Sequence, residues 1–346
     1  MFKKVIVVVM FIFMLASCKS PEIQNRLRKS FNEGWLFEKT KDSLALKVAY
    51  NDANWRSLSL PHDWAIEGPF KPEYDLRTGG LPIFGNAWYR KHFVIDASEE
   101  GNSITLDFDG IMNNSVIYIN GKKVYKRPYG YIGFQIDITP YINFGENNVI
   151  AVKVNPEELS ARWYPGAGIY RNVWLEIKNP VHIKHWGTQV STPVITKNNA
   201  KVSIETRIVN KNDNSRGNYQ LKTIVYDAEG AEVASKICAF GFEKNIESKI
   251  NQDLNITNPK LWDFNTPHLY KAVSTILKND VIIDNYETNF GVRTIEFTRE
   301  GFFLNGRHEK IQGVCLHNDL GPLGSAVNYR ATQRQLEIMK DMGVNA

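Results

Sequence analysis

The chain has 346 residues, of which 43% are hydrophobic, 12% aromatic and 23% charged, and its formal net charge is +5. This balance excludes a disordered protein, and the length allows two or three folded domains. Lysine and arginine form no long run, which argues against nucleic acid as a partner.

The first residues are expected to form an export signal rather than folded structure. Lys3 and Lys4 precede an apolar stretch at residues 5–16, which is shorter than the roughly 20 residues that a membrane span needs. The stretch ends in residues 15–18 (LASC), which resemble a bacterial lipobox and imply cleavage before Cys18 and acylation of that cysteine. We therefore expect an exported protein that is lipid-anchored through Cys18 to a membrane, on its periplasmic side or at the cell surface. The alternative is an ordinary cleaved signal with a chance cysteine.

The next region, residues 26–179, shows short strands separated by turns and no helical period. Strands are expected at residues 88–95, 103–108 and 149–154, among others. Asn120-Gly121 separates two further strands, and this pair is the strongest short hairpin signal because both turn residues need a positive φ. Many short strands with regular turns predict a β-sandwich of the jelly-roll type.

Asn179-Pro180 interrupts this pattern, and a second β region follows at residues 180–291. Apolar and polar residues alternate at residues 202–206, 221–226 and 270–277. About seven strands in roughly 110 residues predict an immunoglobulin-like sandwich. Cys238 and Cys315 stand far apart and outside any metal-binding spacing, so we expect two buried free thiols.

The last region, residues 292–346, changes character. After a hairpin with an Asn305-Gly306 turn, residues 311–316 read as an apolar strand and residues 330–342 as a helix that Gly343 terminates. Strand, helix and a second extended run are the opening of a β/α domain.

Six motifs in order resemble glycoside hydrolase family 2, the family of β-galactosidases, β-glucuronidases and β-mannosidases. The most specific match in the first domain is residues 162–173 (RWYPGAGIYRNV). The others are residues 31–35 (FNEGW), 60–64 (LPHDW) with 88–91 (WYRK), 290–295 (FGVRTI), 313–319 (GVCLHND) and 339–346 (MKDMGVNA). The resemblance implies a mainly β chain with a jelly roll, an immunoglobulin-like sandwich and the first βα unit of a (β/α)8 barrel. With the lipobox-like start, we expect a lipoprotein signal peptide at residues 1–17 and a linker at 18–25, followed by the three regions described above.

The implied activity is retaining hydrolysis of a terminal β-linked sugar, in which two carboxylates about 5–5.5 Å apart share the chemistry. A complete barrel needs about 250 residues, so the resemblance places the two catalytic glutamates beyond this chain, and we expect the chain alone to be inactive. Asn32-Glu33 matches the Asn-Glu pattern of the family's general acid, but it lies in the opening segment and is expected to be a solvent-facing turn.

The resemblance also implies substrate-binding residues at the barrel mouth: Asp63, Arg162, His317, Asn318 and Asp319. His317 ends a barrel strand, where active sites of this fold lie. Asp63 has an alternative role as the cap of the turn before Trp64. Arg162 stands where some relatives carry an aspartate that touches both the sugar and a sodium ion, and arginine cannot ligate sodium. A sodium, magnesium or calcium ion is therefore left open for a complete enzyme, and no metal ligand is assigned.

The partner that these residues predict is an oligosaccharide or polysaccharide substrate, and an oligomer is left open. The leading hypothesis is a β-galactosidase-type hydrolase that lacks the rest of its barrel. The alternatives are a non-catalytic carbohydrate-binding surface lipoprotein, or a fragment of a β-glucuronidase or β-mannosidase.

Overall fold

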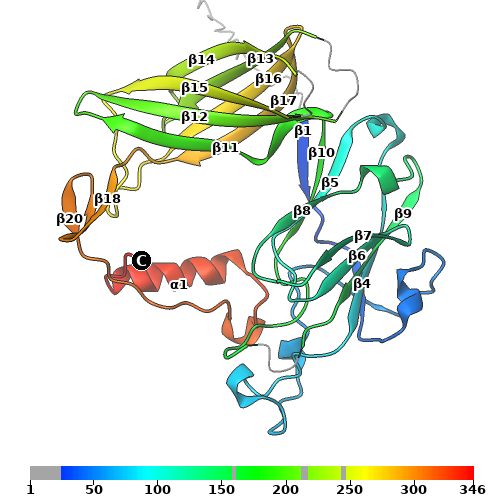
Figure 1. Cartoon of the computed structure of the whole chain (residues 1–346). Coiled ribbons are helices and arrows are strands. Elements are labelled where there is room, and N and C mark those ends of the chain that lie inside the picture. The colour runs from blue at the N-terminus through cyan, green and yellow to red at the C-terminus, as the bar shows by residue number, and fades with distance from the viewer. Residues whose placement is uncertain (1–24, 158–160, 212–216, 243–246) are drawn as a thin grey trace, which may run out of the picture.

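The computed structural model describes residues 25–157, 161–211, 217–242 and 247–346, and within them two β-sandwiches are followed by a hairpin sheet and one α-helix. Figure 1 shows these parts arranged as a ring: the second sandwich, the hairpin, the helix and the first sandwich surround an open centre. The predicted signal residues 1–17 and Cys18 lie outside the described residues. In the described part of the chain, no helix combines the length and the apolar character that crossing a bilayer demands.

The first sandwich contains two antiparallel sheets. Their strands, in spatial order, are β1 (Arg26–Ser30), β10 (Val173–Lys178), β5 (Ser103–Phe108) and β8 (Phe134–Asp137) in one sheet, and β3 (Arg56–Leu58), β2 (Trp35–Glu38), β4 (Ala87–Val94), β9 (Asn147–Val154), β6 (Ser115–Ile119) and β7 (Lys122–Arg127) in the other. Short 3-10 turns lie at Ser43–Leu46, Ala65–Glu67, Leu76–Thr78, Ala97–Glu99 and Thr139–Tyr141.

A large aromatic and aliphatic core fills the space between these sheets. Trp35, Tyr89 and Phe108 are completely buried there, and alternation places Ile117 and Ile119 of β6 on the same inner face. The predicted hairpin is confirmed, because Asn120 and Gly121 have φ values of 49° and 77° between β6 and β7.

The described residues of the second sandwich form seven strands, in line with the predicted number of about seven. One sheet contains β11 (Val181–Ile195), β12 (Asn199–Asn210) and β15 (Glu247–Thr257), and the other contains β14 (Glu232–Phe240), β13 (Tyr219–Tyr226), β16 (Tyr270–Lys278) and β17 (Val281–Phe290). Cys238 is half-buried on β14 and Cys315 is exposed, so the prediction of two buried thiols is wrong. Cys315 lies in an extended segment that no strand covers among the residues the structure describes.

A buried ion pair joins the two sandwiches. The Arg26 guanidinium on β1 donates to both carboxylate oxygens of Asp284 on β17, at 2.9 Å each, and to the carbonyl of Ile183 on β11 at 2.6 Å. The backbone N–H of Ile183 donates to Asp284 at 2.7 Å, so three elements meet at one carboxylate. This contact fixes the second sandwich against the first.

The last region contains the small sheet of β18 (Ile295–Thr298), β19 (Gly301–Leu304) and β20 (Arg307–Glu309), a 3-10 turn at Gly321–Leu323 and the helix α1 (Tyr329–Asp341). The predicted helix is confirmed, and Gly343 with a φ of 87° follows its C-terminus.

The prediction of a strand at residues 311–316 is wrong. The segment is extended, but only Gln312 and Val314 exchange backbone hydrogen bonds with residues 345 and 346. Those bonds, 2.9 to 3.3 Å long, place the segments before and after α1 side by side, as a βα unit requires. A strand of a parallel sheet needs partners along both edges, and the described residues provide a short one on a single edge.

Candidate substrate-binding site

The candidate site lies where the segment before α1 meets the first sandwich. His317 and Asp319 are exposed on this segment, and Asn318 is partly buried. The His317 ring lies 5.6 Å from that of Trp163, which belongs to the loop between β9 and β10. Asn318 Nδ2 donates to the Pro165 carbonyl of the same loop at 3.5 Å. The structure therefore brings His317 and Asn318 to the loop of the sandwich that also carries Arg162.

Asp63, in contrast, is almost fully buried and is held by the protein itself. Oδ1 accepts the backbone N–H groups of Ala65 at 3.0 Å and Ala167 at 2.9 Å. Oδ2 accepts the Tyr164 hydroxyl at 2.5 Å and both the N–H and the hydroxyl of Ser325, at 2.8 and 3.0 Å. A carboxylate offers about four lone-pair positions, so these five donors occupy it. The bond to Ala65 matches the turn-capping alternative, and sugar binding by Asp63 stays a prediction that requires a donor to leave.

Two glycines allow this close contact around Asp63. A Cβ on Gly324 would lie 2.4 Å from Asp63 Oδ2, and one on Gly166 would lie 1.8 Å from the Ser325 hydroxyl oxygen. Both glycines also have a positive φ, 59° and 72°, which disfavours any larger residue. Burial and the carboxylates of Asp63 and Asp319 raise the pKa of Tyr164 far above its usual value, so its hydroxyl remains a hydrogen-bond donor.

Arg162 points its charge outward from the same loop. Its side chain is exposed and makes no hydrogen bond or ion pair with any residue that the structure describes. His317 and Asp319 likewise form no hydrogen bond within the described ranges. These three side chains are free to exchange hydrogen bonds with a ligand, and they supply both donors and acceptors.

Glu33 lies outside this site. It is exposed in the turn before β2 and accepts a hydrogen bond from the Ser59 hydroxyl. The prediction of a solvent-facing turn is confirmed.

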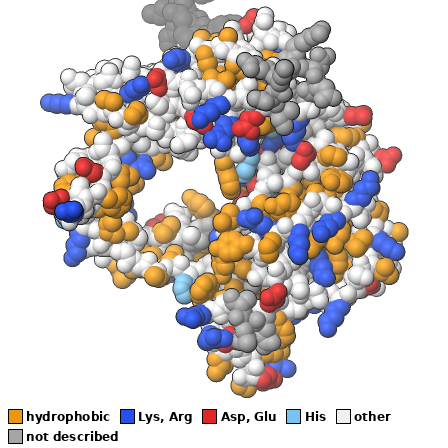
Figure 2. All heavy atoms as spheres, viewed as in Figure 1, with side chains coloured by type: hydrophobic (Ala, Val, Ile, Leu, Met, Phe, Trp, Pro, Cys, Tyr) orange, Lys and Arg blue, Asp and Glu red, His pale blue; other side chains and the backbone are white. Residues whose placement is uncertain are grey.

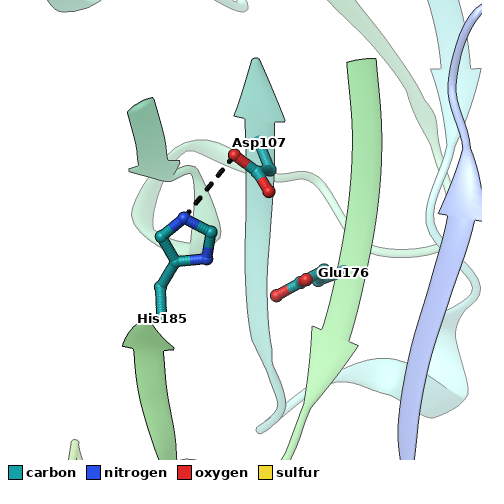
Figure 3. Close-up of side chains that lie close together, drawn as sticks. All are labelled: Asp107, Glu176 and His185. Carbon is teal, nitrogen blue, oxygen red and sulfur yellow. Dashed lines mark ion pairs between the residues drawn. The ribbon is translucent and has the colours of Figure 1, made fainter. Parts of the chain in front are cut away.

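A cluster of three possible metal ligands lies elsewhere, at the junction of the sandwiches. Figure 3 shows Asp107 of β5, Glu176 of β10 and His185 of β11, with His185 Nε2 3.8 Å from Asp107 Oδ1. Arg28 donates to both carboxylates, at 3.0 and 2.8 Å, and Lys178 donates to Glu176 at 2.9 Å.

Two cations therefore already compensate the two carboxylates of this cluster. A metal ion would meet the positive charges of Arg28 and Lys178 beside it, so the donor set does not fit a sodium, magnesium or calcium site. Burial also lowers the pKa of the His185 ring and raises that of Asp107. The cluster is an ion-pair network that supports the junction of the sandwiches.

Sequence reasoning missed two contributors to the candidate site. Ser325 anchors the segment after His317 to Asp63, although 262 positions separate them. Tyr131 lies beside Trp163 and accepts a hydrogen bond from its indole N–H at 2.9 Å. The only local signal for the second contact was the glycine-flanked aromatic sequence at residues 129–133.

Two family models and several known proteins match this chain. Residues 29–180 match the family model described as glycosyl hydrolases family 2, sugar binding domain, and residues 181–293 match that described as glycosyl hydrolases family 2. The chain is 43% identical over 335 residues to the β-galactosidase BoGH2A of Bacteroides ovatus, covering 96% of this chain and 39% of that protein. It is 37% identical to a putative β-glucuronidase of Formosa agariphila, covering 93% of this chain and 30% of that protein.

Solved structures show the same likeness. A family 2 glycosyl hydrolase from Bacteroides cellulosilyticus superposes with a TM-score of 0.88 at 38% identity, covering 92% of this chain and 42% of that one. A β-glucuronidase of Bacteroides uniformis gives a TM-score of 0.83 at 28% identity, with 92% and 39% covered. The chain thus spans less than half of each of these relatives. It belongs to glycosyl hydrolase family 2, and it carries the sugar-binding domain and the immunoglobulin-like domain of that family.

Proposed function

We propose that this chain is the substrate-recognition portion of a retaining β-glycosidase of the β-galactosidase type. The observation that carries the proposal is the group of free polar side chains around Trp163: His317 lies against its ring, and Arg162 and Asp319 are exposed nearby without partners among the described residues. Such groups exchange hydrogen bonds with sugar hydroxyls while an aromatic ring contacts the sugar's C–H face. The β-galactosidase of Bacteroides ovatus, at 43% identity, supports the choice of sugar.

The catalytic glutamates are proposed to lie in the remainder of a (β/α)8 barrel that residues 292–346 begin. An apolar cavity of about 620 Å³ supports this, because side chains of the second sandwich, the segment before α1 and α1 itself face it together. Its apolar lining includes Trp262, Phe264, Val314, Leu316, Leu336 and Met339. Figure 2 shows hydrophobic side chains around the open centre of the ring. Apolar surface of this extent normally packs against further protein.

In the complete enzyme, two carboxylates would perform the chemistry and this chain would position the sugar. One carboxylic acid protonates the leaving oxygen while the other carboxylate attacks the anomeric carbon. Hydrogen bonds that Arg162 and His317 donate and that Asp319 accepts would hold the sugar ring for that attack. Binding energy of this kind contributes to catalysis when it strengthens in the transition state.

A β-glucuronidase is the second candidate, and the free guanidinium of Arg162 is the observation that favours it. Guanidinium groups bind carboxylates through paired, charge-assisted hydrogen bonds, and a glucuronide carries such a carboxylate. The Formosa agariphila relative, at 37% identity, is named a putative β-glucuronidase. If Arg162→Gln lowers the hydrolysis of β-glucuronides and leaves that of β-galactosides unchanged, the result would support this candidate.

We expect the purified chain not to hydrolyse aryl β-galactosides above a blank, whereas a chimera should. The chimera joins residues 25–346 to the remaining part of the Bacteroides ovatus β-galactosidase and is assayed by release of the aryl alcohol. His317→Ala in the chimera should lower kcat/KM by roughly tenfold or more, since a hydrogen bond to a buried ligand is worth about 1–3 kcal/mol. Glu33→Gln, which changes an exposed turn, is the matched control and should have no effect. Turnover by the chain alone would contradict the proposal.

Lipid anchoring through Cys18 is the proposed basis of localisation, with the protein exported and held at a membrane. The support is the lipobox-like residues 15–18 after an apolar stretch. Cells that express the chain with radiolabelled palmitate should yield a labelled protein, and Cys18→Ser should remove the label and release the protein from membranes. Cys315→Ser, at an exposed cysteine, is the matched control and should retain the label. Label that persists in Cys18→Ser would exclude this anchor.

A further inference from the structure

Two tyrosines beside the candidate site are presented to solvent by a tightly fixed loop. The loop, residues 128–133, connects β7 and β8. The Tyr170 hydroxyl donates to the carbonyl of Gly130 at 3.0 Å, and a Cβ on Gly130 would lie 2.8 Å from both the Ile111 carbonyl oxygen and Met112 Sδ. The backbone is thus held closely while 53% of Tyr129 remains exposed.

The rings of this loop continue as a row to the candidate site. Tyr129 and Tyr131 have ring centroids 5.5 Å apart, and Tyr131 and Trp163 have centroids 6.4 Å apart. The indole N–H of Trp163 donates to the Tyr131 hydroxyl, which fixes the relative orientation of these two rings. Trp163, which is 38% exposed, then contacts His317. Tyr129, Tyr131 and Trp163 are called the aromatic row below.

We propose that the aromatic row is a binding subsite for the sugar rings that follow the terminal sugar of an oligosaccharide. This inference rests on the proposed function, because it takes His317 as the contact of the terminal sugar, and it narrows the substrate class to β-linked oligosaccharides. The row begins at His317 and leads away from it, as the second and third rings of a bound chain must.

The chemistry of the row suits such a ligand. Tyrosine and tryptophan present an apolar face for the C–H groups of a pyranose, and the tyrosine hydroxyls can exchange hydrogen bonds with its hydroxyls while the Trp163 N–H stays bonded to Tyr131. The loop is already fixed by Gly130 and Tyr170, so binding requires little ordering of the protein, which favours affinity. The matched family model for residues 29–180 is that of a sugar-binding domain, which also favours a carbohydrate over a protein partner.

The test compares a β-linked galactotetraose with free galactose, using the purified chain and titration calorimetry. All three rings of the row belong to this chain, so the tetrasaccharide should bind measurably and more tightly than galactose. Tyr129→Ala and Trp163→Ala should each weaken tetrasaccharide binding by roughly five- to tenfold, which is the effect of losing one aromatic contact. Phe70→Ala removes an aromatic side chain that is 68% exposed and lies outside the row, so it is the matched control and should not change the affinity.

Equal affinity for galactose and the tetrasaccharide, absence of tetrasaccharide binding, or wild-type affinity in both row variants would overturn the proposed subsite. The chimera distinguishes this failure from failure of the proposed function. An active chimera in which the row variants hydrolyse the tetrasaccharide normally would leave the glycosidase proposal intact and reject the subsite. An inactive chimera with row-dependent binding in the chain would reject the glycosidase proposal instead.

Discussion

Asp284→Ala is expected to lower the free energy of unfolding by about 3–5 kcal/mol, because it removes one partner of a buried ion pair and leaves the other charge uncompensated. Asp284 is completely buried, and the Arg26 guanidinium that pairs with it is only 8% exposed. The substitution also removes the acceptor of the Ile183 N–H, so a buried backbone donor loses its partner. The measurement is urea denaturation followed by tryptophan fluorescence.

The double variant Arg26→Met with Asp284→Ala tests whether the loss of stability comes from leaving the Arg26 charge without its partner. It removes both charges together, so its unfolding free energy should exceed that of Asp284→Ala alone. Glu229→Ala, which breaks the exposed pair with Lys260, is the matched surface control and should leave the denaturation midpoint unchanged. A midpoint for Asp284→Ala that equals the wild-type value would show that the junction does not depend on this pair.

Local sequence signals predicted those features that depend only on residues adjacent in the sequence. The Asn120-Gly121 turn needs two positive φ values, and the alternation at residues 221–226 needs only one buried face, so both could be read without knowing any partner. The helix at residues 329–341 carries its own periodicity and its own terminating glycine.

Contacts between distant residues could not be predicted in this way. Arg26 and Asp284 are 258 positions apart, and neither is marked by its neighbours as a buried charge. The strand expected at residues 311–316 depends on partners on both edges, so its apolar composition alone did not decide its structure. Cys315 was predicted to be buried for the same reason, since burial of a strand follows from the elements that cover it.

For the candidate site, family resemblance indicated the residues but not how each is used. It led to both His317 and Asp63, which occur in ordered motifs of the sequence. Only the structure distinguishes the exposed His317 ring beside Trp163 from the Asp63 carboxylate that five protein donors occupy.

Asp63→Asn is therefore expected to release the segment that carries His317 from the first sandwich. The amide oxygen of asparagine can replace only one carboxylate oxygen, and its NH2 group would face the donors that now reach the other. The backbone N–H groups of Ala65 and Ala167 donate to Oδ1, and Tyr164 and Ser325 donate to Oδ2. Unsatisfied buried donors cost about 1–3 kcal/mol each, so the free energy of unfolding should fall by about 2–4 kcal/mol.

The local consequence is testable by limited proteolysis with chymotrypsin and mass spectrometry of the fragments. In the wild-type chain Ser325 is completely buried and bonded to Asp63 by two groups, which should protect the peptide bonds after Leu320 and Leu323. Asp63→Asn should make these bonds the first to be cleaved, while Asp319→Asn, at an exposed carboxylate on the same segment, should cleave as the wild type does. Equal protection of residues 317–328 in Asp63→Asn and the wild type would mean that other contacts hold the segment. Faster cleavage confined to those residues would instead identify the Asp63 carboxylate as the group that holds the His317 segment against the sugar-binding domain.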